Sequence, residues 1–156
     1  MTQAALAIDV HADATKVIAA AAAAAHPKET GGILLGWWDD GQVAVRHAVE
    51  VPDPHATTNS WSRDELRAQA ALDAAMAESQ HPWLGYVGDW HSHPTAHGAS
   101  KQDLASIRRA SRQYDQPLVL LIHPADSAFG AIAARRGRRR QATLRLTTTA
   151  RGADAL

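Results

Sequence analysis

Two histidines in the stretch His91-Ser92-His93 have the spacing of metal ligands. On a β-strand, residues two apart point to the same face and lie about 6.6 Å apart along the chain, so both imidazoles can reach one ion. A catalytic zinc site usually takes three protein ligands and leaves one position open for water or substrate. The pair therefore needs one further ligand from a nearby His, Asp or Glu.

Asp103 and His97 are the two candidates for this third ligand. Asp103 falls one turn inside the helix expected after Pro94, so a strand end and a helix start would bring it to the histidines. The stretch from Ser100 to Asp103 also fits a capping box, in which the serine and the acidic residue three positions later complete the first turn of a helix. Ser100 can thus serve either as a helix cap or as a functional hydroxyl.

Metal-assisted hydrolysis also requires a carboxylate that takes a proton from the attacking water and passes it to the leaving amine. Glu29 can supply this general base if folding brings it close to the histidines. It follows Pro27 and precedes Gly31 and Gly32. From the residues alone, a solvated loop carboxylate is therefore the first interpretation of Glu29.

The elements that must position these residues follow from hydrophobic periodicity and turn residues. Residues 83–92 predict a buried strand that Pro94 ends, so both histidines fall at the end of a strand. Asp39-Asp40-Gly41 indicates a hairpin, and Asp13 is the expected N-cap of the first helix. Strands are expected at residues 4–10, 31–38, 42–51, 83–92, 118–123, 129–134 and 142–148, and helices at 13–25, 63–79 and 100–114. This pattern predicts an α+β fold with a mixed, mostly antiparallel curved sheet packed by about three helices.

The composition limits the classes of protein that need to be considered. The chain has 156 residues, which suits one domain at 1–150 with a frayed tail at 151–156. It contains no cysteine and has a formal net charge of zero, which excludes thiolate zinc sites and any global field for nucleic acid or membranes. The N-terminus lacks the features of a secretory signal, and no apolar run is long enough to span a bilayer. We therefore expect a cytoplasmic protein.

Three separated motifs together resemble the JAMM (MPN+) metalloprotease family. They are Glu29 with the glycine-rich block that follows it, His91-Ser92-His93-Pro94, and Ser100 with Asp103. The tryptophan before His91 is similar to the prokaryotic Prok-JAB branch of that family. The resemblance covers most of the chain, and it implies an MPN/JAB-like fold of the cytidine-deaminase-like type.

The resemblance implies a role for each motif. Glu29 would be the general base, and His91, His93 and Asp103 would bind one zinc ion per chain. Ser100 would donate a hydrogen bond to the oxyanion of the tetrahedral intermediate. One departure is that nine residues separate His93 from Asp103 where the family usually has ten, so the intervening loop is one residue shorter.

By the same resemblance, the protein is expected to hydrolyse an isopeptide or peptide bond after the C-terminal tail of a bacterial ubiquitin-like protein. The extended tail would add as a strand beside the site. Such enzymes deconjugate or mature a modifier and accompany ubiquitin-transfer-like enzymes in anti-phage defence operons. The alternatives are a peptidase that processes a sulfur-carrier protein in cysteine or cofactor biosynthesis, and a metal-free MPN scaffold without activity.

The stretch from Arg135 to Arg140 is the one dense basic run of the sequence. It could contact nucleic acid or an acidic partner, but a hairpin turn with solvated arginines is the simpler interpretation. The tryptophans are interpreted as core and rim packing, because no basic residues interleave with them, although Trp90 could also wall the metal pocket. A nucleic-acid partner is therefore not expected.

Overall fold

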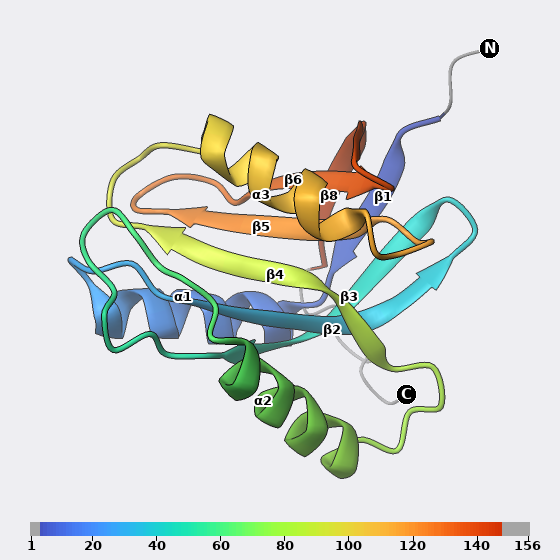
Figure 1. Ribbon diagram of the computed structural model, residues 1–156, viewed down its shortest axis with the longest axis horizontal. Coiled ribbons are helices and arrows are strands. Elements are labelled where there is room, and N and C mark those ends of the chain that lie inside the picture. The colour runs from blue at the N-terminus through green and yellow to red at the C-terminus, as the bar shows by residue number, and fades with distance from the viewer. Residues whose placement is uncertain (1–3, 148–156) are drawn as a thin grey trace.

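The computed structural model describes residues 4–147, and within this range it contains three helices and one eight-stranded sheet (Figure 1). The helices are α1 (Ala12–Ala25), α2 (Glu65–Glu78) and α3 (Lys101–Ser111). The strands are β1 (Leu6–Val10), β2 (Gly31–Asp39), β3 (Gln42–Glu50), β4 (Gly85–His93), β5 (Leu118–Pro124), β6 (Gly130–Arg135), β7 (Arg138–Arg140) and β8 (Ala142–Leu146). These elements confirm the predicted α+β class.

The sheet has the strand order β7-β6-β5-β4-β2-β3-β1-β8. Four neighbouring pairs are antiparallel, while β4 with β5, β1 with β3 and β1 with β8 are parallel. The sheet is strongly curved and nearly closed, and the N-terminal strand lies between β3 and the last strand of the described chain. The mixed, curved sheet expected from the sequence is confirmed. Strand β4 lies at the centre of the sheet, between β5 and β2, so the predicted metal ligands belong to a strand with a hydrogen-bonded neighbour on each side.

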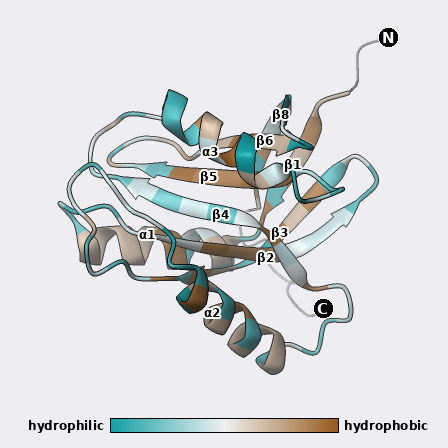
Figure 2. Cartoon of the chain, in the orientation of Figure 1, coloured by the Kyte–Doolittle hydropathy of each residue, from teal (hydrophilic) through white to brown (hydrophobic). Residues whose placement is uncertain are grey.

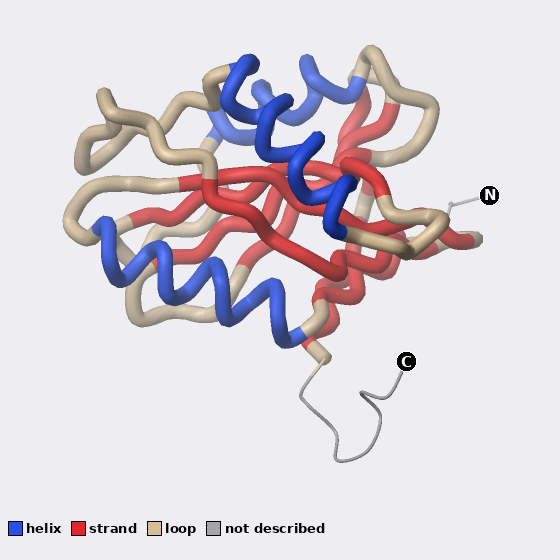
Figure 3. The backbone as a smooth tube through the Cα atoms, turned by 90° about the horizontal axis from the view of Figure 1, so that it is seen from below, coloured by secondary structure: helices blue, strands red, loops and turns tan. Residues whose placement is uncertain are grey.

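Helices cover both faces of the sheet (Figure 3). On one face, α1 buries Ile18 against a core that includes Trp90 of β4. On the other face, α3 buries Ile107 against alternate residues of β5, and α2 buries Ala68 against Ile33 of β2. Figure 2 shows hydrophobic stretches in β2 and β5, and a more hydrophilic α3 beside β5. Complete burial of a side chain such as Ile18 stabilises the fold by about 2 kcal/mol.

Several sequence predictions need correction in detail. The N-cap of α1 is His11, whose ring accepts a hydrogen bond from the backbone N–H of Asp13, whereas Asp13 was the expected cap. Trp90 is fully buried in the core on the α1 face and does not wall the metal pocket. Residues 138–140 form strand β7, which the sequence did not predict because three consecutive arginines carry no strand signal. Residue 148 and the predicted tail at 151–156 lie outside the described residues.

In the described part of the chain, no helix is both long enough and apolar enough to cross a membrane.

Candidate metal centre

Strand β4 places His91 and His93 at the end of the sheet. It pairs with β2 on one side, where Gly31 faces His91, and with β5 on the other, where Pro124 faces His93. The alternating pattern of the strand turns both imidazoles to the face that α3 covers, while Ser92 between them is buried. Pairing with β2 as far as His91 and with β5 as far as His93 fixes the backbone of both ligands.

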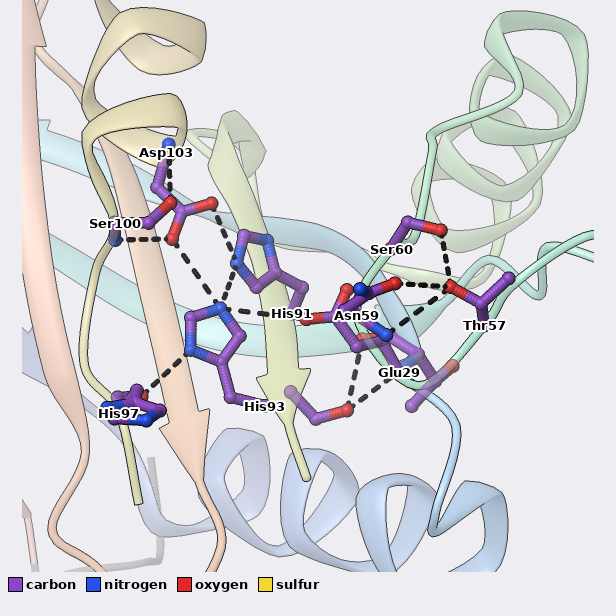
Figure 4. A network of polar contacts seen from close by, with 11 residues as sticks. Glu29, Thr57, Asn59, Ser60, His91, His93, His97, Ser100 and Asp103 are labelled. Atoms are coloured by element: carbon purple, nitrogen blue, oxygen red, sulfur yellow. Dashed lines mark hydrogen bonds and ion pairs between the residues drawn. The ribbon is translucent and has the colours of Figure 1, made fainter. Parts of the chain in front are cut away.

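The two histidines and Asp103 form a compact cluster (Figure 4). The Nε2 atoms of His91 and His93 are 3.1 Å apart. The carboxylate oxygens of Asp103 lie 3.2 Å from Nε2 of His91 and 3.5 Å from Nε2 of His93. One ligand atom from each residue falls within 4.8 Å of the others, and this is the one such group of three or more found among residues 4–147. The three side chains, only 12–13% exposed, are close enough for one ion.

Hydrogen bonds from the neighbouring backbone hold two of these ligands in the geometry that a metal requires. The Nδ1 atom of His93 lies 2.8 Å from the backbone carbonyl oxygen of His97. A donated bond there places the proton on Nδ1 and leaves Nε2 free to bind a metal. The backbone N–H of Ser100 donates to Asp103 at 2.8 Å and orients its carboxylate. His97 therefore supports the site through its carbonyl, and its ring is not part of the cluster.

The surroundings of Asp103 favour its charged form. Burial acts to raise the pKa of Asp103, but hydrogen bonds from His91 and from the backbone N–H of Ser100, together with the charge of His91, outweigh it. The pKa of Asp103 is held at about 2. Two imidazole nitrogens and an ionised carboxylate are a donor set that suits zinc and neighbouring divalent transition metals. The three side chains of the cluster thus suit the zinc ion that was expected from the sequence.

The lowered pKa of Asp103 predicts how the stability of the metal-free protein depends on pH. A carboxyl group whose pKa is lower in the folded state stabilises that state above its unfolded pKa of about 3.9, and the gain is lost as the pH falls through its folded pKa. We expect about 2 kcal/mol of unfolding free energy to disappear between about pH 5 and pH 2 through this residue. Urea unfolding of the wild type and of Asp103→Asn tests this. Parallel pH profiles for the two proteins would contradict the assignment.

Glu29 lies beside the cluster immediately before β2 (Figure 4). Its carboxylate is 3.8 Å from Nε2 of His93 and only 10% exposed. The backbone N–H of Glu29 donates to the carbonyl oxygen of Thr57 at 2.8 Å, so the loop after β3 fixes this residue. Burial raises the pKa of Glu29, against the lowering effect of His91 and His93. Folding thus brings the predicted base to the site, and the solvated-loop interpretation of Glu29 is wrong.

Close packing explains why glycine occupies position 31, two residues after Glu29. A Cβ atom on Gly31 would lie 2.6 Å from the carbonyl oxygen of Trp90 and 2.7 Å from the ring of Trp61. The Trp61 ring also lies 6.4 Å from the ring of His91 and donates its N–H to the carbonyl oxygen of Val51. The wall of the site on this side is therefore Trp61, which the sequence did not distinguish from the other tryptophans.

Ser92 connects the segment that carries Glu29 to β4, the strand that carries His91 and His93. Its hydroxyl accepts a hydrogen bond from the backbone N–H of Thr30 at 3.0 Å and lies 3.3 Å from the carbonyl oxygen of the same residue. The backbone N–H of Ser92 also donates to that carbonyl at 2.8 Å. Because Thr30 follows Glu29 directly, these bonds hold the carboxylate in register with the two histidines. Sequence spacing gave no sign of this role, since Ser92 was only the residue between two ligands.

Replacement of Ser92 by alanine should reduce the free energy of unfolding by about 1–3 kcal/mol, because it leaves the buried N–H of Thr30 without a partner. Ser106→Ala, on the exposed face of α3, is the matched control and should change it by less than about 0.5 kcal/mol. Chemical denaturation of both variants measures the difference. Equal stability of the two would show that the hydroxyl of Ser92 does not hold this segment.

An ion pair beside the metal site fixes the segment before α2. The guanidinium of Arg63 donates to both carboxylate oxygens of Asp89 at 2.9 Å, and Tyr86 donates to the same carboxylate at 2.8 Å. Asp89 lies on the same face of β4 as His91, two residues before it. The loop between β3 and α2, which contacts Glu29 through Thr57, is therefore also bound to β4 through Arg63.

The comparison with protein families decides where the chain belongs. Residues 11–141 match the model of the family described as prokaryotic homologs of the JAB domain. This protein belongs to the Prok-JAB family. The predicted family is confirmed, and the match includes all the motifs on which the resemblance rested.

Relatives of this Prok-JAB chain agree with that assignment. The probable metalloprotease y4qB of Sinorhizobium fredii is 37% identical over 73 residues, and this stretch makes up 46% of the chain and 44% of that protein. The match thus spans less than half of its curated relative. The solution structure of protein DSY2949 from Desulfitobacterium hafniense has a TM-score of 0.64 at 19% identity, covering 91% of this chain and 95% of that one. This likeness shows a shared fold.

A crystal structure of AF2198, a JAB1/MPN domain protein from Archaeoglobus fulgidus, superposes less closely on the Prok-JAB chain. Its TM-score is 0.47 at 19% identity, with 87% of this chain and 97% of that one covered.

Ser100 of the Prok-JAB chain takes the capping role, one of the two that the sequence left open. Its hydroxyl oxygen accepts the backbone N–H of Asp103 at 3.0 Å, and the reciprocal bond to the Asp103 carboxylate completes a capping box. The Ser100 side chain also hydrogen-bonds the Asp103 carboxylate and helps to lower the pKa of Asp103. The structure thus gives Ser100 a capping role, and its role toward an oxyanion stays a prediction.

Proposed function

We propose that this protein is a zinc-dependent peptidase or isopeptidase that cleaves after the C-terminal tail of a bacterial ubiquitin-like protein. The observation that carries the proposal is the convergence of a buried carboxylate, Glu29, with the cluster of His91, His93 and Asp103. A likeness to a probable metalloprotease supports the same class of reaction.

The three ligands would hold one zinc ion, which would supply a Lewis acid to polarise the scissile carbonyl and activate water. Glu29 would accept the proton of the attacking water and deliver it to the leaving amine, and its carboxylate, 3.8 Å from Nε2 of His93, supports this role. Burial raises the pKa of Glu29 toward the range in which a base can also return the proton as an acid. The Ser100 hydroxyl would donate to the oxyanion as the carbonyl becomes tetrahedral.

The pairing of the strands at the site bears on how a substrate tail would bind. Both β2 and β4 already have a hydrogen-bonded neighbour on each side, so a tail cannot add as a strand to either of them at the site. The loop that contains Thr57 and the indole of Trp61 lies next to Glu29 and is the nearest structure with which an extended tail could form contacts. We infer that this loop and the Trp61 indole contact a tail that ends in glycine.

A direct assay uses two forms of a ubiquitin-like sulfur-carrier domain whose C-terminal glycine is joined to a fluorescent lysine, one through a peptide bond to the α-amino group and the other through an isopeptide bond to the side-chain amine. We expect release of the fluorophore after the last glycine, loss of activity with a chelator, and recovery on addition of zinc. No release of fluorophore by zinc-loaded protein from this domain, or from modifiers with other glycine tails, would contradict the proposed reaction.

Two alternatives make different predictions in this assay. A peptidase for sulfur-carrier proteins would release an amino acid from the tail of the carrier but would not cleave an isopeptide bond to a lysine side chain. An MPN scaffold would bind the glycine tail without cleaving it and would contain no zinc. The complete ligand set argues against the scaffold.

A further inference from the structure

Arginines from two distant parts of the sequence meet on one surface of the fold. Eight of the 16 basic residues occur within residues 108–112 and 135–140, although the formal net charge of the chain is zero. The first group belongs to the end of α3 and its C-cap, and the second to the hairpin between β6 and β7. All the arginines at positions 108–112 and 135–139 are exposed. We call these seven side chains the arginine surface.

Specific contacts hold the two groups together. Ser111 is fully buried, and its hydroxyl accepts the backbone N–H of Gly137 at 2.9 Å. The carbonyl oxygen of Ser111 accepts the N–H of Arg136, and Arg108 donates through Nε to the carbonyl oxygen of Gly137 at 3.0 Å. Gly137 has φ +81°, and a Cβ atom there would lie 3.0 Å from the side chain of Arg112. The hairpin turn is thus fastened to the helix end, and the surface is a fixed feature of the fold.

Few acidic groups balance this surface. Asp115 forms an ion pair with Arg136 at 3.0 Å, and its carbonyl oxygen accepts a hydrogen bond from Arg135. Arg109 and Arg138 form no side-chain hydrogen bond or ion pair with another residue in the range 4–147. Clustered like charges destabilise a fold slightly. Three of these arginines, Arg108, Arg109 and Arg112, line a shallow hollow of about 200 Å³ on α3, and this arrangement indicates a binding role.

The position of the arginine surface relative to the metal site is set by α3. Asp103 lies in the first turn of this helix, and Arg109 and Arg112 lie about 9–14 Å further along it at 1.5 Å per residue. Figure 2 shows strongly hydrophilic residues along α3, which lies over the hydrophobic strand β5. About four extended residues would cover this distance. A protein body on the outer side of α3 could therefore send a short tail over the N-terminal end of the helix to the metal.

We propose that the arginine surface binds an acidic face of a protein partner. Guanidinium groups match carboxylates through paired hydrogen bonds. Residues 108–112 and 135–139 contain no aromatic side chain on which bases could stack, and this favours protein over nucleic acid. If the proposed peptidase function holds, the partner is the folded body of the substrate, since α3 and its C-cap carry three arginines of the surface as well as Asp103.

Binding can be tested without any cleavage. The probes are fluorescent poly-L-glutamate and a single-stranded DNA with the same number of charges, titrated by anisotropy at low and moderate salt. The test variant Arg109→Glu/Arg138→Glu takes one residue from each group. Lys16→Glu/Arg67→Glu has the same change in charge on exposed residues outside the arginine surface and is the matched control.

We expect the test variant to bind poly-L-glutamate about tenfold more weakly than wild type, and the control to differ by less than about twofold. The affinity of wild type should fall with salt, and thermal melting should show that both variants remain folded. Equal weakening in both variants, or no binding of poly-L-glutamate by wild type, would overturn the proposal. Clearly tighter binding of DNA than of poly-L-glutamate would assign the surface to nucleic acid instead. Because these titrations need neither metal nor hydrolysis, a failure of the proposed peptidase function would leave their result intact.

Discussion

Replacement of Glu29 by glutamine is expected to lower the rate of amide hydrolysis by about 10²- to 10⁴-fold, the range in which a general base contributes. Glutamine keeps the shape of the side chain and the backbone bond from residue 29 to Thr57. It cannot accept the proton of water. Because Glu29 is not one of the three clustered ligands, the zinc content of the variant should equal that of wild type. Steady-state cleavage and elemental analysis of the same preparation measure both quantities.

The pH dependence of kcat/KM is a second test of Glu29. Burial raises the pKa of this carboxyl group, and the base must be ionised to act. The kcat/KM of the wild type should therefore fall at acidic pH, and the residual activity of Glu29→Gln should depend less on pH in that range. Glu50→Gln is a matched control, since this carboxylate accepts a hydrogen bond from Thr30 but lies outside the metal cluster. If Glu29→Gln lost its zinc, or if Glu50→Gln lost as much activity, Glu29 would not be the base.

The sequence predicted the parts of the site that rest on short-range patterns. The two histidines were assigned to a strand end because Pro94 must stop β4 there, and the capping pattern of Ser100 and Asp103 marked the start of α3. The core strands were found for the same reason, because their apolar periodicity is strong. Strand β7 was missed, since its three arginines are paired only because the turn at Arg136 and Gly137 folds them back onto β6.

Contacts between distant segments could not be predicted from the sequence. Only the folded sheet brings Ser92 against Thr30, which is 62 positions earlier in the chain. The same holds for Thr57 behind Glu29 and for Ser111 behind Gly137. His97 shows a different limit, because its residue type suggested a ring ligand while its contribution is a backbone carbonyl that any residue could supply.

This distinction at His97 leads to a test of the metal ligands. In the wild type we expect about one zinc per chain. His91→Ala and Asp103→Ala should each lose nearly all of it, because two remaining ligands cannot hold zinc tightly. His97→Ala should retain zinc, since alanine keeps the carbonyl that lies 2.8 Å from Nδ1 of His93. Elemental analysis after dialysis against a weak chelator separates the two groups of variants.

The shorter loop between His93 and Asp103 makes this experiment decisive for the ligand set. With one residue fewer than is usual in the family, the loop still lets Asp103 approach both histidines, at 3.2 and 3.5 Å. A backbone bond from Ser100 to the Asp103 carboxylate and the carbonyl of His97 hold the ligands from either end of this loop. Loss of zinc from His97→Ala with retention by Asp103→Ala would mean that the ring of His97 replaces the carboxylate when metal binds. The capping box at Ser100 would then be a helix cap alone, and the first turn of α3 would have no part in catalysis.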